Sequence, residues 1–175
     1  MDTSDDALGY HITLYPGIQV DSWKIDHFQE FFLNAFEMVK PPSDANISLQ
    51  KFLRFHFKDR LRIGRMADQI FVMADLKTDL EMDSYFTEIE NLMDEACQQL
   101  GTKPDYSVED TRPKHITISI GKLKHKQLSD AEFERAAAAI KQINFADLVK
   151  DIDIDVDEIF ISLKKGEYTT VSLFG

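Results

Sequence analysis

The same tripeptide, His-Ile-Thr, occurs twice in this chain of 175 residues, at 11–13 and again at 115–117. Each copy lies in a short run of alternating polar and apolar residues, Tyr-His-Ile-Thr-Leu-Tyr and Lys-His-Ile-Thr-Ile-Ser. Such alternation is typical of a β-strand with one buried face. Two matching strands far apart in the sequence indicate that one structural unit is present twice, and this constrains the fold more than any other feature.

Hydrophobic spacing predicts three helices and a larger number of short strands. Apolar residues recur at helical spacing over residues 22–39, 83–100 and 130–143. Alternating or continuously apolar runs predict strands at 10–15, 47–57, 60–65, 70–76, 114–120, 152–156, 159–164 and 168–174. The last two strands are joined at Lys165-Gly166-Glu167 as a terminal hairpin.

The order of these elements is repeated along the chain. A His-Ile-Thr strand, a helix and further strands occupy residues 9–78, and a connecting helix spans residues 82–100. A second His-Ile-Thr strand, a helix and further strands occupy residues 113–175. We therefore expect one α+β domain over residues 1–175, in which antiparallel sheets flanked by helices form two pseudo-symmetric lobes around a central cleft.

Composition narrows the classes of protein. A hydrophobic content of 43% suffices for one good-sized core. No run is apolar enough to cross a bilayer, and the N-terminus lacks the order of a signal peptide. Cys97 is the single cysteine, which excludes an internal disulfide. We therefore expect a soluble intracellular protein.

The charges are strongly segregated. A net charge of −11 argues against a nucleic-acid partner, but residues 54–65 form a basic strip that consists of Arg54, Lys58, Arg60, Arg62 and Arg65. Salt screens charges beyond roughly 8–10 Å, so a basic strip on an acidic body can still bind phosphate. A solvated strand face is the alternative interpretation. The acidic run at 151–158 is predicted to be a strand protected from edge pairing, not a set of metal ligands.

The two tripeptides carry the candidate chemistry. Residues i and i+2 of a strand project to the same face. The first run therefore presents His11, Thr13 and Tyr15, and the second presents His115, Thr117 and Ser119, each over aliphatic residues that point into the core. If the two strands lie side by side, two imidazoles and two hydroxyls line one cleft.

Two imidazoles suit the cleavage of RNA by its own 2′-hydroxyl. One histidine removes the proton of the 2′-hydroxyl and the other protonates the leaving 5′-oxygen. The threonine hydroxyls donate to the phosphate oxygens as charge develops on them. We expect His11 as proton acceptor and His115 as proton donor, with no metal and no cofactor, because the sequence offers no metal-binding motif.

The paired motifs resemble the two-histidine (2H) phosphoesterase superfamily, whose members carry two His-x-Ser/Thr motifs in a bilobal fold. Three segments are most similar to the U6 spliceosomal RNA phosphodiesterase family, namely Pro-Lys-His-Ile-Thr-Ile-Ser, the strand-turn-strand at 57–73 and the closing hairpin that ends at Phe174. The resemblance runs from Tyr10 to Phe174. It implies a nuclear, metal-independent 3′-to-5′ exonuclease that trims the uridine-rich end of U6 small nuclear RNA and leaves a 2′,3′-cyclic phosphate.

The resemblance also implies roles for individual residues. His11 and His115 correspond to the acid–base pair, and Thr13 and Thr117 stand where serines are common in the family. The substrate-binding residues carried over with them are Arg65, the backbone of Pro113 and Lys114, and Tyr106; Tyr15 is added because it shares the face of His11 and Thr13. The family stacks the terminal base on a tyrosine before the second histidine; Glu109 occupies the ungapped position here, and Tyr106 is the nearest aromatic residue.

Several alternatives stay open at this point. The same chemistry fits a 2′,3′-cyclic nucleotide or 2′,5′-oligoadenylate phosphodiesterase, and a module that binds RNA ends without cleaving them has the same surface. The basic strip favours a polymeric substrate. We expect a monomer whose partner is the oligouridine 3′ end of U6 RNA. The family has a strand and a helix before the first motif, for which the nine residues before Tyr10 are too few.

Overall fold

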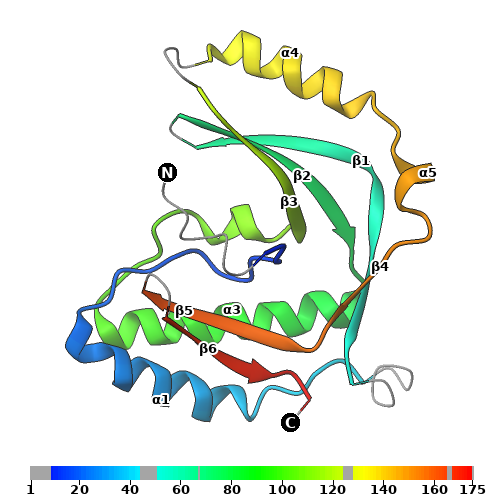
Figure 1. Ribbon diagram of the computed structural model, residues 1–175. Coiled ribbons are helices and arrows are strands. Elements are labelled where there is room, and N and C mark those ends of the chain that lie inside the picture. Colours follow the sequence, from blue (N-terminus) through cyan, green and yellow to red (C-terminus); the bar gives the residue numbers. More distant parts are fainter. Residues whose placement is uncertain (1–8, 44–50, 67, 124–127, 165–166, 175) are drawn as a thin grey trace.

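The computed structural model describes residues 9–43, 51–66, 68–123, 128–164 and 167–174. Within these described residues, six strands form two antiparallel sheets, of which the larger has the order β3-β2-β1-β4 and the smaller pairs β5 with β6 (Figure 1). Their bounds are β1 (Leu53–Met66), β2 (Gln69–Lys77), β3 (His115–Lys122), β4 (Asp153–Val156), β5 (Glu158–Lys164) and β6 (Glu167–Ser172). The predicted α+β class with antiparallel sheets and flanking helices is confirmed.

The helices lie where the hydrophobic spacing predicts them. They are α1 (Ile25–Phe36), α3 (Leu80–Leu100), α4 (Asp130–Lys141) and the single turn α5 (Ala146–Val149), with 3-10 turns η1 (Ser22–Lys24) and η2 (Val108–Thr111). The helix ends differ from the predicted ones by up to three residues. Asp79 accepts a hydrogen bond from the N–H of Met82 at the start of α3, and Ser129 with Glu132 forms a capping box on α4.

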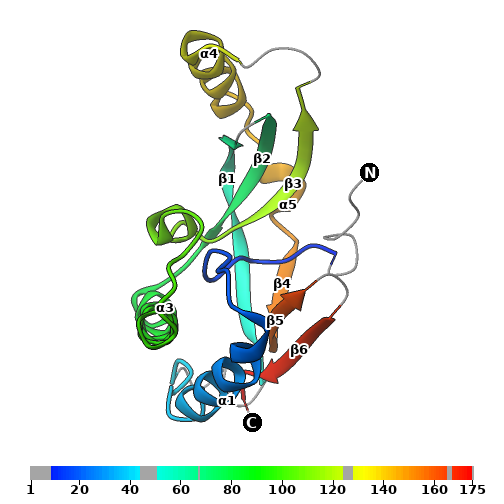
Figure 2. The same cartoon turned by 90° about the vertical axis from the view of Figure 1, so that its left-hand side faces the viewer.

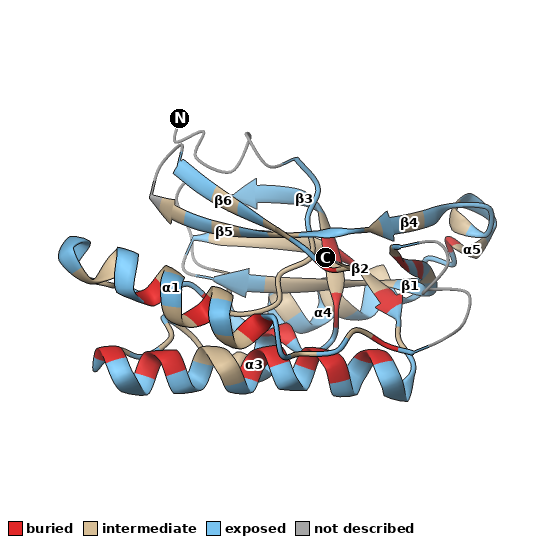
Figure 3. Ribbon diagram, turned by 90° about the horizontal axis from the view of Figure 1, so that it is seen from below, coloured by how far each residue is buried: buried red, intermediate tan, exposed pale blue. Residues whose placement is uncertain are grey.

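The core lies between the sheets and the pair α1–α3. Phe28, Phe32 and Phe36 follow one another at helical spacing on α1, and their rings stack with centroids 6.1 and 5.7 Å apart. Buried residues alternate with exposed ones along α1 and α3, as expected for helices that cover a core on one side (Figure 3). No helix among the described residues is long and apolar enough to cross a membrane.

Strand β1 replaces two predicted strands. The sequence predicts strands at 47–57 and 60–65, but residues 53–66 form one strand with an irregularity in its pairing to β2 between Phe57 and Leu61. This irregularity bends the strand without ending it. Residues 44–50, 124–127 and 165–166 lie outside the described part, and so do the beginning of the predicted 47–57 strand and most of the hairpin turn.

The predicted strand at 10–15 is largely wrong. Within this segment only Ile12 pairs with another strand, through one isolated antiparallel bridge to Ile116 on β3. The chain then leaves the sheet, and the hydroxyl of Tyr15 bonds to Asp94 on α3. Pairing to β3 is thus limited to the tripeptide itself.

The two predicted units share strands in space. Strand β3, from the second unit, pairs with β2 of the first, and β4 of the second pairs with β1 of the first. Figure 2 shows the N-terminal segment beside β3, with the β5–β6 hairpin next to it and α3 and α4 toward the other side. The stretch that carries the first tripeptide therefore lies where the two sheets meet.

Candidate active site

The two His-Ile-Thr tripeptides lie side by side and antiparallel. Ile12 and Ile116, the central residues, are bridge partners; Ile116 is buried in the hydrophobic core and the partly buried Ile12 packs against it. Neighbours of an inward-facing residue in an extended chain project to the opposite face. The histidine and threonine of each tripeptide therefore project away from the core and α3, so that His11 neighbours Thr117 and Thr13 neighbours His115. We call these four residues the histidine face.

Both imidazoles are held in the same way. Nδ1 of His115 lies 2.8 Å from the carbonyl oxygen of Pro113, and Nδ1 of His11 lies 3.1 Å from that of Gly9. A carbonyl oxygen only accepts, so in both rings Nδ1–H is the donor. Gly9 has φ +62°, in the left-handed region that favours glycine. Each Nε2 is left without a bond from any described residue, so each ring presents a free nitrogen for proton transfer.

The surroundings of His115 favour a neutral ring. Asp75 on β2 lies directly opposite His115 in the sheet, and Arg62 on β1 binds this carboxylate through three contacts of 2.8 to 3.1 Å. Nη2 of Arg62 also lies 3.3 Å from Nδ1 of His115. Burial lowers the pKa of His115 below its ordinary value, and the positive charges of Arg62 and Lys114 add to this, against the bond to Pro113 and the charge of Asp75.

Sequence reasoning did not identify Arg62 and Asp75 as site residues. Arg62 was one of five basic residues in a strip, with nothing to set it apart. Asp75 had a signal that could have found it, because it is the one charged residue in the apolar run Ile-Phe-Val-Met-Ala-Asp-Leu. A carboxylate in a strand of this kind needs a partner, and the structure supplies Arg62.

A bulge separates Ser119 from the histidine face. Thr117 pairs with Met73, but Ser119 pairs with Val72, and the register shifts between them. Because Val72 and Met73 are consecutive on β2, they project to opposite faces, and so do their partners. The prediction that Ser119 projects with His115 and Thr117 is therefore wrong.

Two of the predicted substrate-binding side chains, those of Tyr15 and Arg65, contact helices. The hydroxyl of Tyr15 donates to Asp94 at 2.5 Å and lies 3.7 Å from Sγ of Cys97, and burial with these contacts raises its pKa. Arg65 bonds to Asp130 and to the carbonyl of Leu128, and its guanidinium lies 4.7 Å from the ring of Phe133. Tyr15 thus anchors the first tripeptide to α3, and Arg65 anchors α4 to β1.

Lys114 is buried beneath the site. The residue is 4% exposed. Its ammonium lies 3.7 Å from a carboxylate oxygen of Glu90 on α3 and donates a hydrogen bond to the carbonyl of Thr111 at 2.9 Å. Burial lowers its pKa, against the attraction of Glu90. Its own carbonyl accepts from the N–H of Leu76 at 2.8 Å. Lys114 therefore fixes the start of β3, and Pro113 contributes the carbonyl that orients His115. Tyr106, which precedes Lys114 in the sequence, is half-buried, and this burial raises the pKa of its hydroxyl.

The basic strip is largely neutralised by carboxylates. Arg54 contacts Asp153 and Asp155 of β4 at 3.5 and 2.8 Å, so the acidic run 151–158 supplies a strand partner, as its alternation predicts. With Arg62 bound to Asp75 and Arg65 to Asp130, three of the five cations are paired. Lys58 and Arg60 form no ion pair with any described residue. The strip therefore offers far less free charge to phosphate than its composition suggests.

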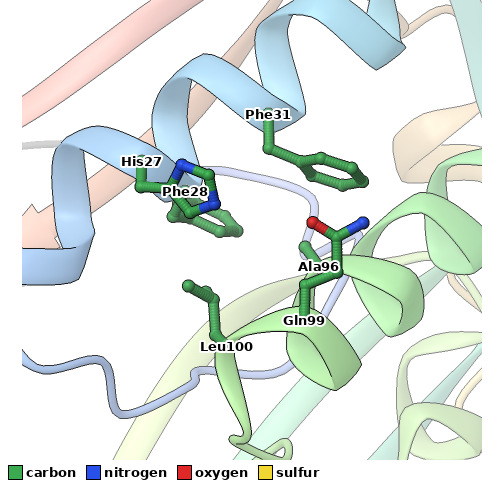
Figure 4. Close-up of a pocket in the computed structure, with 6 residues that line it drawn as sticks. All are labelled: His27, Phe28, Phe31, Ala96, Gln99 and Leu100. Atoms are coloured by element: carbon green, nitrogen blue, oxygen red, sulfur yellow. The ribbon is translucent and has the colours of Figure 1, made fainter.

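The two depressions beside α3 do not include the histidine face. The small apolar depression in Figure 4 lies between α1 and α3 and is lined by His27, Phe28, Phe31, Ala96, Gln99 and Leu100, none of which belongs to the tripeptides. Among the described residues, no group of three or more His, Cys, Asp or Glu side chains is arranged to hold a metal ion. The groups that the bridge brings together at this face are imidazoles and hydroxyls.

The sequence matches no protein-family model and no curated protein. Its fold, however, is that of a solved α+β protein with antiparallel sheets and helices. This structure is Usb1 of Kluyveromyces marxianus with uridine monophosphate, with a TM-score of 0.61 over 94% of this chain and 74% of the Usb1 chain. The sequences are 9% identical, so the likeness concerns the fold alone.

Proposed function

We propose that this protein is a metal-independent RNA phosphodiesterase, a monomeric 3′-to-5′ exonuclease that trims the oligouridine end of U6 small nuclear RNA in the nucleus. The observation that carries the proposal is the Ile12–Ile116 bridge, because it sets two imidazoles and two hydroxyls on one face. The Usb1 fold, solved with a uridine nucleotide, supports it at the level of class. The choice of U6 RNA as the substrate follows from the resemblance of the motifs to the U6 phosphodiesterase family.

The proposed reaction is acid–base catalysis, in which one imidazole accepts a proton and the other imidazole donates one. Nε2 of one neutral imidazole takes the proton of the 2′-hydroxyl, and the 2′-oxygen forms a bond to phosphorus. The bond from phosphorus to the 5′-oxygen breaks as the other ring, in its imidazolium form, protonates this oxygen. Thr13 and Thr117 donate to the phosphate oxygens, and the chain ends in a 2′,3′-cyclic phosphate. Water then opens the 2′,3′-cyclic phosphate, in a step in which the two imidazoles exchange the roles of acid and base.

The surroundings of His115 favour it as the proton acceptor. A lowered pKa keeps the His115 ring neutral near pH 7, and only the neutral ring accepts a proton. His11 is exposed and then serves as the donor. This assignment reverses the one that we expect from the sequence.

One observation favours a second candidate, a phosphodiesterase of 2′,3′-cyclic nucleotides. The sequence argument for a polymer depends on the basic strip, and three of its five cations are bound to carboxylates. A small substrate needs fewer phosphate contacts than an RNA chain. The two candidates share the histidine face and differ in substrate length.

A cleavage assay in EDTA tests the proposal. A 5′-labelled RNA ending in uridines and a 2′,3′-cyclic uridine phosphate are each incubated with the wild-type chain and with His11→Ala, His115→Ala, Thr117→Val and Thr117→Ser. Stepwise shortening of the RNA by wild type is expected, with no cleavage by either histidine variant. Thr117→Val is expected to lose about 10²-fold in rate, as for the loss of one oxyanion donor, and Thr117→Ser to retain most activity.

Each outcome separates the candidates. Hydrolysis of the cyclic nucleotide without shortening of the RNA would replace the first candidate by the second. Cleavage that persists in both histidine variants, or that requires a divalent metal, would refute the mechanism. Retention of the RNA on a native gel without cleavage would indicate a module that binds RNA ends.

A further inference from the structure

Arg62 and Asp75 lie against His115 but neither accepts nor donates a proton in the proposed reaction. The guanidinium Nε and Nη2 atoms of Arg62 lie 3.0 and 2.8 Å from Oδ1 of Asp75, and Nη2 lies 3.3 Å from Nδ1 of His115. The Arg62 and Asp75 side chains are 32% and 17% exposed, so water screens the pair only in part. The three groups come from three adjacent strands, β1, β2 and β3.

We propose that the Arg62–Asp75 pair is a positioning pair for His115, in which Arg62 withholds the Asp75 carboxylate from the imidazole and keeps the ring in its neutral form with Nε2 free. The inference deepens the proposed function of the histidine face and rests on it for its catalytic meaning. The arrangement of the three side chains does not depend on that function.

The argument starts from what a carboxylate beside a histidine ordinarily does. Asp75 is the cross-strand partner of His115, and a free carboxylate there would accept the Nδ1 proton and stabilise the imidazolium. Arg62 occupies both carboxylate oxygens, with contacts of 2.8 and 3.0 Å to Oδ1 and 3.1 Å to Oδ2. The Nδ1–H of His115 therefore donates its hydrogen bond to the carbonyl oxygen of Pro113.

The position of the guanidinium adds to this effect. Arginine has only donors, so Arg62 cannot accept the Nδ1 proton, and its charge disfavours a second positive charge on the ring. Among the described residues, Lys114 on the same strand also acts on the charge of His115, and His11 lies diagonally across the Ile12–Ile116 bridge. Lys114 is bound to Glu90, which leaves Arg62 and Asp75 as the two groups whose removal changes the ring most directly.

Two substitutions are therefore expected to move His115 in opposite directions. Arg62→Met removes the guanidinium and frees the carboxylate, and both changes stabilise the imidazolium, so the pKa of His115 rises. Asp75→Asn removes the carboxylate and leaves the guanidinium beside the ring, so the pKa of His115 falls. Arg62→Lys keeps the charge without the two-pronged contact and is expected to lie between wild type and Arg62→Met.

The measurement is a histidine NMR titration of the full chain without substrate, with the His115 signal assigned by its loss in His115→Gln. Arg54→Met is the matched control, because Arg54 lies on the same strand and binds Asp155 across the sheet, far from His115 in register. It is expected to leave the His115 titration unchanged. Opposite shifts in Arg62→Met and Asp75→Asn support the proposal.

Unchanged His115 titrations in Arg62→Met and Asp75→Asn, or shifts of both in the same direction, would overturn the proposal of a positioning pair. If Arg62→Met does not fold by circular dichroism, Asp75→Asn and Arg62→Lys still decide the sign. The pH profile of RNA cleavage is the second readout, and its acidic limb is expected to move to higher pH in Arg62→Met. Opposite NMR shifts in a chain that cleaves no RNA would keep the positioning pair and reject the proposed function.

Discussion

Lys114 illustrates how a residue next to the candidate catalytic histidine can serve the fold. The resemblance places its backbone at the phosphate site, and its ammonium is buried against Glu90 and over the ring of Phe86, 5.3 Å from the centroid. A buried charge is kept only when it is paired and hydrogen-bonded, and Glu90 with the Thr111 carbonyl meets both needs. Lys114 therefore joins the start of β3 to α3, directly before His115.

Replacement of Lys114 by methionine is expected to destabilise the protein. The change leaves Glu90, which is 5% exposed, without its nearest buried cation. Breaking a buried pair costs about 3–5 kcal/mol, and we expect the lower end because Arg112 still contacts Glu90 at 3.4 Å. Urea denaturation measures the free energy of unfolding.

Lys122→Met is the control for this measurement. Lys122 contacts Asp68 at 3.5 Å on the surface, where such pairs contribute about 0–1 kcal/mol. Equal destabilisation by the two substitutions would show that the pairing of Lys114 with Glu90 adds nothing. The double variant Lys114→Met with Glu90→Gln should recover part of the loss, since it removes the uncompensated charge.

Helix α3 connects the two tripeptides to the rest of the molecule. Its buried residues pack against both the sheet and α1, and its polar residues hold Tyr15 and Lys114. The helix ends at Gly101, which has φ +69°, and the N–H of Thr102 bonds to the carbonyl of Cys97. The left-handed end turns the chain back toward the segment at 104–111 that leads to His115.

Gly101→Ala is expected to destabilise the protein by about 1 kcal/mol, because alanine is strained in the left-handed region. No atom lies within 4 Å of the added methyl group, so the cost is one of backbone conformation alone. Gly121→Ala is the matched control, since Gly121 has no positive φ and its nearest contact is at 4.0 Å. Thermal unfolding of the two variants tests this, and equal melting temperatures would contradict it.

At the scale of the whole molecule, the basic strip is balanced by carboxylates within an acidic body. The net charge is −11, yet arginines of the basic strip contact carboxylates from β2, β4 and α4. Affinity for RNA that depends on phosphate neutralisation falls with salt in proportion to the number of phosphates contacted. For the proposed RNA substrate, the few free cations of the basic strip would imply binding through the RNA end rather than along the RNA backbone.

We expect a weak salt dependence of RNA binding. With Lys58 and Arg60 as the free cations of the strip, log K should fall with log salt with a slope of about −1 to −2, given about −0.7 per phosphate for single strands. Fluorescence anisotropy of a labelled oligouridine measures the slope. The double variant Asp153→Asn with Asp155→Asn frees Arg54 and should steepen it, whereas a wild-type slope beyond about −4 would contradict the neutralised strip.

Local patterns in the sequence determined the elements and the candidate catalytic groups. Helices α1, α3 and α4 follow from apolar spacing and caps, which act between residues three or four apart. Both tripeptides, with their alternating neighbours, placed a histidine and a threonine on one face of an extended segment. These properties depend on nearest neighbours along the chain, so the sequence displays them directly.

Only the tertiary structure decided which groups meet. Arg54 and Asp155 are 101 residues apart in the sequence, and Arg62 and His115 are 53 apart. The limited pairing of Ile12, the bulge before Ser119, the anchoring of Tyr15 and the neutralised basic strip all depend on the register between distant strands. The hydrophobic pattern of a strand fixes which of its faces is buried, but which distant strand it pairs with, and where a bulge falls, depends on how the whole core packs.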